Sequence, residues 1–221
     1  MKILGIDTAT SVATVALMDD DKLIGLMTLN DKKTHSQKLM VLVETLLENT
    51  DHTFEDIDRI AVACGPGSFT GLRIGVTTAK ALAHGAGKPV VEISSLKSLA
   101  YNLQGSHVCA LMDARRDTVF AGIYGDDPME DAQMHINELL ERCQNFDHIW
   151  FVGDGATKHR DLIMETLKDK ALFAPKHLNI SSAGSLCELA LLSRDEKKYD
   201  DVHVTYLRKS QAEREYEEKQ K

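Results

Sequence analysis

The sequence lacks several features that would point directly to a cofactor, a membrane or an oxidising compartment. Its cysteines are few and far apart, with no C-x-x-C pair: Cys64, Cys109, Cys143 and Cys187. Such spacing predicts neither a zinc knuckle nor a disulfide framework. No apolar run approaches the roughly 18 residues of a membrane span, and no basic, apolar leader precedes the first strand pattern. We therefore expect a cytoplasmic protein without membrane contact.

Positive charge is also in short supply. Lys and Arg number 26 against 34 Asp and Glu, which gives a formal net charge of −8. Affinity for nucleic acid comes largely from cationic neutralisation of phosphates, so we expect any RNA contact to run through a partner. The apolar content of 43% is ordinary for a globular protein, and 221 residues suit two modest lobes.

The common catalytic signatures are missing as well. The chain contains no H-E-x-x-H, no G-x-x-x-x-G-K-[ST] and no G-x-S-x-G sequence. Its nine histidines are scattered and form no convincing i, i+4 metal pair. We therefore predict no catalytic set, no metal ligand and no cofactor of the chain's own.

What is present is a series of strand and helix patterns. Apolar runs at 2–7, 12–18 and 22–29 predict a meander of three strands, and 59–64 and 88–93 predict two more. Residues 34–50 carry an apolar stripe at helical spacing that includes Leu39, Met40 and Val43. A second helix is predicted from about Thr70 to Ala83, with Ser68 or Thr70 as its cap, and a third over 95–102, with Ser94 as its cap.

The turn Gly65-Pro66-Gly67 and the helix after it are the most informative stretch. A glycine-rich turn that leads into a helix N-terminus can bind phosphate, so Gly65, Gly67 and Ser68 are candidates. A dinucleotide fingerprint is disfavoured, because Gly65-x-Gly67-x-x-x-Gly71 is one residue too long. The third reading is a tight turn before a helix that packs closely on another backbone through Gly71, Gly75 and Ala79, and that backbone can belong to another protein.

The pattern then starts again. Residues 107–113 form a strand that ends in Asp113, as 2–7 end in Asp7, and 118–124 form the next strand. Residues 149–155 repeat the order of strand and glycine turn, and helices are predicted at 157–167 and 183–192. Such self-similarity predicts a duplicated two-lobe α/β fold. We expect a first lobe at 1–103, a second at 104–207, with 199–207 extended, and a charged tail at 208–221.

Several of these segments resemble known families. Gly65-Pro66-Gly67-Ser68-Phe69-Thr70-Gly71-Leu72-Arg73-Ile74-Gly75 resembles the hallmark of the TsaB (YeaZ) family. Residues 112–116, 152–155 and 206–212 also match family segments, so the resemblance extends to about residue 212. The turn 7–11 resembles the first phosphate-facing turn of the actin/sugar-kinase/Hsp70 (ASKHA) superfamily. The resemblance therefore implies an ASKHA-like α/β fold.

The resemblance also implies a role. TsaB-family proteins are non-catalytic subunits of the machinery that makes threonylcarbamoyladenosine (t6A) at tRNA position 37, where they pair with TsaD and work with TsaE. TsaD carries an H-x-x-x-H metal motif, and the aligned positions here are Ser95, a weak ligand at best, and Leu99, which cannot bind a metal, so this alignment implies that the metal site is lost. The helices 34–50 and 70–83 would bind TsaD, or a second copy when the chain is alone. The interface residues expected, about half of them internal, are Leu39, Met40, Val43, Gly71, Leu72, Gly75, Val76 and Ala79.

A nucleotide site stays open at this point. Asp7, Thr8 and Thr10 would face a phosphate together with the glycine turn, and ATP or ADP could lie at the subunit junction. The alternative reading is a free-standing nucleotide-dependent ASKHA enzyme. Against it, no Lys or Arg accompanies the turn at 8–11, and Asp154 stands where adenosine would approach. Arg115 and Arg116 are either the cations of such a site or surface ion-pair partners. A peptidase has no support in these residues.

Overall fold

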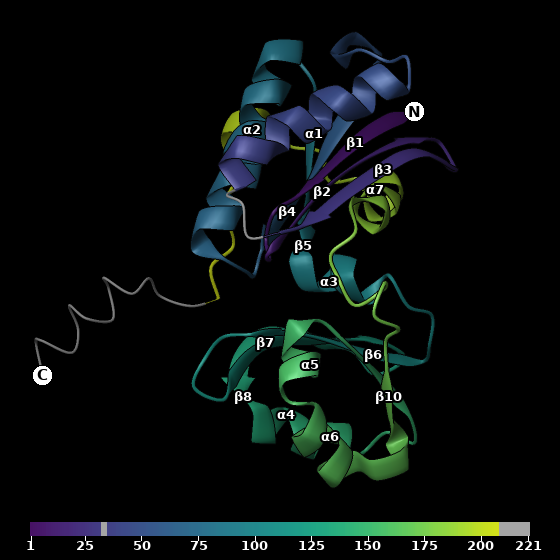
Figure 1. Cartoon of the computed structure of the whole chain (residues 1–221), viewed down its shortest axis with the longest axis vertical. Helices are drawn as coiled ribbons and strands as arrows, with labels where there is room; N and C mark the ends of the chain where they lie inside the picture. Colours follow the sequence, from purple (N-terminus) through teal and green to yellow (C-terminus); the bar gives the residue numbers. More distant parts are fainter. Residues whose placement is uncertain (32–34, 208–221) are drawn as a thin grey trace, which may run out of the picture.

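The computed structural model describes residues 1–31 and 35–207, which form two lobes (Figure 1). Each lobe contains one five-stranded mixed sheet. The first sheet has the order β3 (Lys22–Asn30), β2 (Val12–Asp19), β1 (Lys2–Asp7), β4 (Arg59–Gly65), β5 (Val90–Ser94). The second has the order β8 (Met129–His135), β7 (Thr118–Gly125), β6 (His107–Asp113), β9 (Ile149–Val152), β10 (Ala171–Phe173). The two orders are equivalent strand by strand, so the duplication predicted from the sequence is confirmed.

Strand pairing follows from the lengths of the connections. β1 pairs antiparallel with β2 and parallel with β4, and β6 pairs in the same two ways with β7 and β9. The antiparallel pairs are joined by short turns, whereas the parallel ones need a longer crossover that contains a helix. The predicted meander at the N-terminus is therefore confirmed. β1 and β4 are buried along almost their whole length, as their continuous apolar runs indicate.

Helices cover both faces of each sheet, and on one face they come from the sheet's own half of the chain. α1 (His35–Asn49) and α2 (Phe69–Ala86) pack on the first sheet, and their apolar residues share a core with β1, β2 and β4. α4 (Ile136–Cys143), α5 (Asp154–Lys158) and α6 (Arg160–Leu167) bring apolar residues to the core of the second sheet. Of the two cap candidates for α2, Ser68 is the cap, since its side chain accepts from the Gly71 N–H. The predicted cap Ser94 is confirmed, because its side chain accepts from the Lys97 N–H.

The remaining two helices are exchanged between the lobes. α3 (Ser95–Ala100) follows β5, yet its apolar side chains pack with those of the second sheet. α7 (Ala183–Leu192) follows the second sheet, yet it packs on β1, β2 and β4. Residues after α7 also return to the first lobe, where Val202 is buried in its core. The division of the chain at residue 103 stays a prediction, and the packing of α7 shows how closely the two parts are joined.

Some boundaries differ from the expected ones. α2 extends to Ala86 and ends at Gly87, whose φ of 65° is left-handed. The helix expected at 157–167 is two helices, α5 and α6, that meet at His159. β8, α4 and β10 were not predicted, and the segment at 199–207 begins with a 3-10 turn, η3 (Tyr199–Asp201). The other 3-10 turns are η1 (Phe54–Asp56) and η2 (Lys168–Lys170). The charged tail lies outside the described residues.

Within residues 1–31 and 35–207, no helix combines the length and the apolar character that crossing a membrane requires.

Candidate functional site

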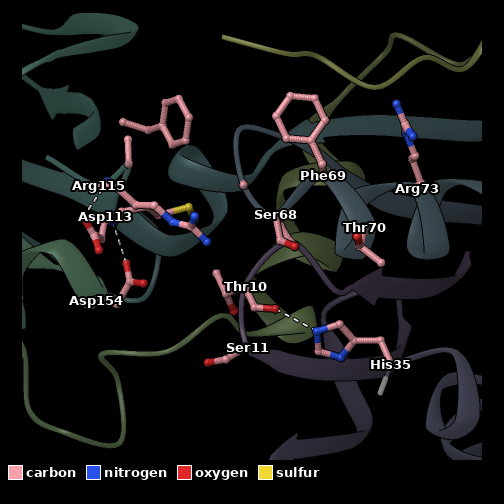
Figure 2. A pocket seen from close by; sticks show the side chains of 15 residues that line it. Thr10, Ser11, His35, Ser68, Phe69, Thr70, Arg73, Asp113, Arg115 and Asp154 are labelled. Atoms are coloured by element: carbon pink, nitrogen blue, oxygen red, sulfur yellow. Dashed lines mark hydrogen bonds between the residues drawn. The ribbon is translucent and has the colours of Figure 1, made fainter. Parts of the chain in front are cut away.

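A cleft of about 800 Å³ lies between the two lobes. The β1–β2 turn and the start of α2 line it from the first lobe, and the β6–β7 turn and Asp154 line it from the second. Figure 2 shows Asp113, Arg115 and Asp154 on the side opposite to Phe69, Thr70 and Arg73. The other lining residues are Ala9, Thr10, Ser11, His35, Gly67, Ser68, Met112, Ala114 and Phe120. The duplicated strand order therefore brings two equivalent turns face to face.

Asp7 ends β1 beneath the first turn and is only 1% exposed. Its Oδ1 accepts a hydrogen bond of 2.8 Å from the Ala9 N–H, whereas its Oδ2 has no partner among the described residues. Burial raises the pKa of Asp7 to about 6, against smaller opposing effects of Ala9, Ser181 and His35. The Nε2–H of His35 donates to the Thr10 carbonyl oxygen over 2.8 Å, which ties the turn to α1 (Figure 2).

The β1–β2 turn also accounts for Gly71 and Gly75 of α2, because both lie against Thr8. A Cβ at Gly71 would collide with the Thr8 carbonyl oxygen, and one at Gly75 would lie 2.5 Å from Thr8 Oγ1. Gly67 is equally close to the Ala9 carbonyl oxygen. Two hydrogen bonds fix the approach, from Thr8 Oγ1 to the Gly71 carbonyl at 2.8 Å and from the Ser68 N–H to the Ala9 carbonyl at 2.7 Å. The backbone that the glycine stripe approaches is thus the chain's own, and no partner is needed to explain it.

The residues expected to face a phosphate divide into two groups. Thr10, Gly67 and Ser68 line the cleft. Asp7 and Thr8 lie buried behind them. Gly65 lies apart from the cleft. Its φ is 125°, and a Cβ at this position would collide with the Thr205 carbonyl oxygen. The cleft is thus reached by three of the six candidates, and the binding of a nucleotide stays a prediction.

On the second-lobe side of the cleft, the carboxylates of Asp113 and Asp154 accept hydrogen bonds from neighbouring residues. Asp113 Oδ1 accepts from the Arg115 N–H at 2.8 Å and from Lys158 Nζ at 2.7 Å, and Asp154 Oδ1 accepts from the Asp113 N–H at 3.1 Å. Burial opposes ionisation of Asp113, but the hydrogen bonds from Lys158 and Arg115 outweigh it and lower the pKa of Asp113. Burial raises the pKa of Asp154. A phosphate that entered here would meet two carboxylates, as Asp154 led us to expect.

Two arginines, Arg73 and Arg115, line the cleft together with its two carboxylates. Lys158, which the sequence did not single out, is paired with Asp113. Arg115 lines the cleft with a left-handed φ of 68°, and Arg116 beside it is exposed. Neither Arg115 nor Arg116 makes an ion pair within the part of the chain that the structure describes. Their reading as surface ion-pair partners therefore gains no support.

Ser95 and Leu99, the positions that we expected to align with the metal-binding histidines of TsaD, have structural contacts here. Ser95 Oγ accepts a hydrogen bond of 3.2 Å from the Gly65 N–H, and Leu99 packs in the core between α3 and the second sheet. Among residues 1–31 and 35–207, no group of three or more His, Cys, Asp or Glu side chains is placed to hold a metal ion.

The expected partner-binding residues are mostly internal. Leu39, Val43, Leu72 and Ala79 are at most 1% exposed, and Val76, Gly71 and Gly75 are also buried. The apolar side chains among them belong to the core of the first lobe, and the two glycines lie against Thr8 of the β1–β2 turn, so within this chain they stabilise the fold. Met40 alone among the eight is exposed, at 36%. Other exposed residues on the outer faces of these helices include Val41 on α1 and Thr77 and Ala81 on α2.

Comparison with known proteins agrees with this geometry. The family model described as "TsaD: tRNA N6-adenosine threonylcarbamoyltransferase" matches residues 22–216. The chain is 35% identical to the tRNA threonylcarbamoyladenosine biosynthesis protein TsaB of Bacillus subtilis, over 100% of both chains. It is 33% identical to the protein of the same name in Escherichia coli, over 79% of this chain and 82% of the relative. The chain belongs to the TsaB family.

Solved structures give the same result for the fold. A Pseudomonas aeruginosa protein described as similar to the peptidase YeaZ superposes with a TM-score of 0.77 at 25% identity, over 94% of this chain and 99% of that one. The activator of 2-hydroxyisocaproyl-CoA dehydratase from Clostridium difficile, solved with ADPNP, superposes with a TM-score of 0.52 at 11% identity, over 99% and 98%. The TsaB-family chain thus has the ASKHA fold that its sequence predicted.

Proposed function

We propose that this chain is the non-catalytic subunit of the complex that transfers threonylcarbamoyl to N6 of the adenosine at tRNA position 37. The observation that carries the proposal is the full-length identity of 35% to the B. subtilis TsaB protein. The net charge of −8 supports a role in which tRNA is bound through the complex and not by this subunit alone.

The side chains of the chain's own cleft support the absence of catalysis. The positions that would carry the metal-binding histidines are a hydrogen-bonded Ser95 and a core Leu99. On the second-lobe side of the cleft, the N–H groups of Asp113 and Arg115 are already bonded to the carboxylates of Asp154 and Asp113 and are not free to bind a phosphate. Metal-ion and electrostatic stabilisation of a reacting oxygen would have to come from another subunit.

The partner surface in this proposal is the outer face of α1 and α2. Met40 and Val41 are exposed by 36% and 52%, and the exposed side chains of Thr77 and Ala81 on α2 are small. Small residues let a facing helix approach closely, while apolar side chains beside them act as anchors. TsaD is the partner proposed for this face. When TsaD is absent, a second copy of the chain binds the same face, and TsaE joins the pair formed with TsaD.

ATP or ADP is proposed for the junction of the subunits, not for this chain alone.

The test is a threonylcarbamoylation assay on unmodified tRNA with the threonylcarbamoyl-adenylate synthase, TsaD and TsaE, with and without this chain. Val41→Glu places a charge on the proposed face without entering the core. Met164→Glu, on the exposed side of α6, is the matched control, because Met164 is 43% exposed in the other lobe. We expect product only when the chain is present, at least a tenfold loss of TsaD binding with Val41→Glu, and wild-type binding with Met164→Glu. Equal binding by both variants would remove the interface from the proposal.

The second candidate is a nucleotide-dependent enzyme, which the 800 Å³ cleft between ASKHA lobes favours. Under this reading the pure chain hydrolyses ATP, and Asp7→Ala abolishes the turnover. Absence of turnover together with a requirement for the chain in the tRNA assay would leave the first proposal standing.

A further inference from the structure

The segment Val202–Leu207, called the strap below, ends the described chain beside α2 (Figure 1). Val202 is 1% exposed in the core of the first lobe, and the Thr205 N–H donates to the Cys64 carbonyl at the end of β4 over 2.7 Å. The ring of Tyr206 stacks on Phe69 with centroids 4.6 Å apart and 13° between the planes. Its hydroxyl oxygen accepts a hydrogen bond of 3.0 Å from Arg73 Nε. The first lobe therefore holds the strap by backbone and side-chain contacts.

Leu207, the next residue, packs against the other lobe. Leu207 packs against the apolar cluster formed by α3 and the second sheet, which includes Phe120 and Val152. Leu207 and Phe120 also line one narrow pocket together with Phe69 and Tyr206. Two consecutive residues, Tyr206 and Leu207, thus contact opposite lobes.

The strap contacts both lobes on a different side of the molecule from the covalent connection that follows β10. The lobes are joined covalently by α3 with residues 101–106 and by residues 174–182. In Figure 1 the connection after β10 lies on one side of the molecule, and the strap descends beside α2 on the other. Phe69 and Phe120, which the strap brings together, both line the interlobe cleft. A two-lobed fold joined along one side opens on the other, and the strap spans that side.

We propose that the strap is a latch that fixes the opening of the interlobe cleft, with Tyr206 as its anchor on the first lobe and Leu207 as its anchor on the second. Opening the cleft requires either that Leu207 leave its apolar cluster or that Tyr206 leave the Phe69 ring and the Arg73 guanidinium. A latch made of one stacked pair, one neutral acceptor and one leucine is weak enough to open without unfolding either sheet. The proposal concerns the isolated chain and holds whether or not the chain binds TsaD.

The experiment is hydrogen–deuterium exchange on the full chain. Tyr206→Ala removes the first anchor, Leu207→Ala removes the second, and Tyr206→Phe keeps the stack but loses the bond to Arg73. Tyr199→Ala is the matched control. Tyr199 contacts His84 near the end of α2, away from Phe69 at its start, with ring centroids 4.3 Å apart. We expect the amides of residues 65, 67–70 and 114–118, on the two sides of the cleft, to exchange about tenfold faster in both alanine variants. Tyr206→Phe should lie between, and Tyr199→Ala should match the wild type.

Two results would overturn the latch. One is wild-type exchange of the cleft amides in both alanine variants. The other is an increase spread evenly over β1, β4 and β6 as well, which would show that the strap only adds global stability. The Tyr206→Phe variant keeps the test decisive if an alanine variant fails to fold, since a faster exchange confined to the cleft supports the latch and an unchanged one counts against it.

Discussion

Asp7 is a carboxylic acid enclosed at the end of a buried strand, with one oxygen bonded to the Ala9 N–H and the other without a partner among the described residues. An unfolded aspartate titrates near 3.8, and burial raises the pKa of Asp7 in the folded protein to about 6. Between these two values the folded state binds more protons than the unfolded state. Stability therefore falls as the pH rises from about 4 to about 6, and the loss persists above that range.

This behaviour predicts the effect of Asp7→Asn. The amide keeps the shape and the acceptor for the Ala9 N–H but carries no charge, so the variant should be more stable than the wild type by about 3 kcal/mol at pH 7. The gain should vanish near pH 4. Urea unfolding from pH 4 to pH 8 measures it, and Asp21→Asn, at an exposed turn, is the control. A variant less stable than the wild type at pH 7 would mean that the charge of Asp7 is compensated in the fold.

At the scale of single elements, α2 carries its glycines for two different reasons. Gly75 lies against Thr8, where a Cβ would come within 2.5 Å of Oγ1, whereas Gly85 has nothing within 4 Å of the same position. The first glycine allows two backbones to approach, and the second only weakens the helix. Sequence spacing alone does not separate the two cases, because it does not show what lies opposite each residue.

The pair makes a matched prediction within one helix. Gly75→Ala should lower the free energy of unfolding by about 1–3 kcal/mol, since either the β1–β2 turn or α2 must shift. Gly85→Ala should raise it by about 0.5–1 kcal/mol, because alanine is the better helix former at an open position. Thermal and urea denaturation of the two variants measure both effects. Equal changes of the same sign would show that the close approach at Thr8 is not what selects glycine.

The elements predicted correctly from the sequence are those with strong local signals. β1, β2 and β4 are continuous apolar runs, and α2 has a side-chain cap at its start. β8 was missed because Met-Glu-Asp-Ala-Gln-Met-His is largely polar and lies at a sheet edge, and β10 because it has three residues. The site was predicted in part: Thr10, Gly67 and Ser68 reach the cleft, but the Asp113–Lys158 pair depends on a contact 45 residues apart.

At the scale of the whole molecule, the exchange of α3 and α7 makes each sheet depend on residues from the other half of the sequence. α7 buries Leu186 and Cys187 against Ile3 and Ala16 of the first sheet. Burial of such side chains contributes about 1.5–3 kcal/mol each, a large share of the stability of a small domain. The five strands of the first sheet therefore do not make a complete lobe.

This dependence predicts the behaviour of fragments. Residues 1–103 contain all five strands of the first sheet but lack α7, so the fragment should show no cooperative unfolding transition by circular dichroism. Coexpression with residues 104–221 should restore a folded complex, because the exchanged helices then find their sheets. A cooperative transition of the 1–103 fragment alone would contradict this and support an independent first lobe. The full chain, unfolded under the same conditions, is the reference.

The exchange of α7 also has a consequence for synthesis. A ribosome completes β5 at Ser94 long before it reaches Ala183, where α7 begins. At bacterial elongation rates of about 5–20 residues per second, the interval is on the order of 5–20 s. During that time the nascent first sheet presents Ile3, Ala16 and Ala61 without their covering helix. Trigger-factor-like chaperones, which shield apolar surface at the exit tunnel, should therefore raise the yield of this chain more than that of a protein whose lobes are completed in sequence order.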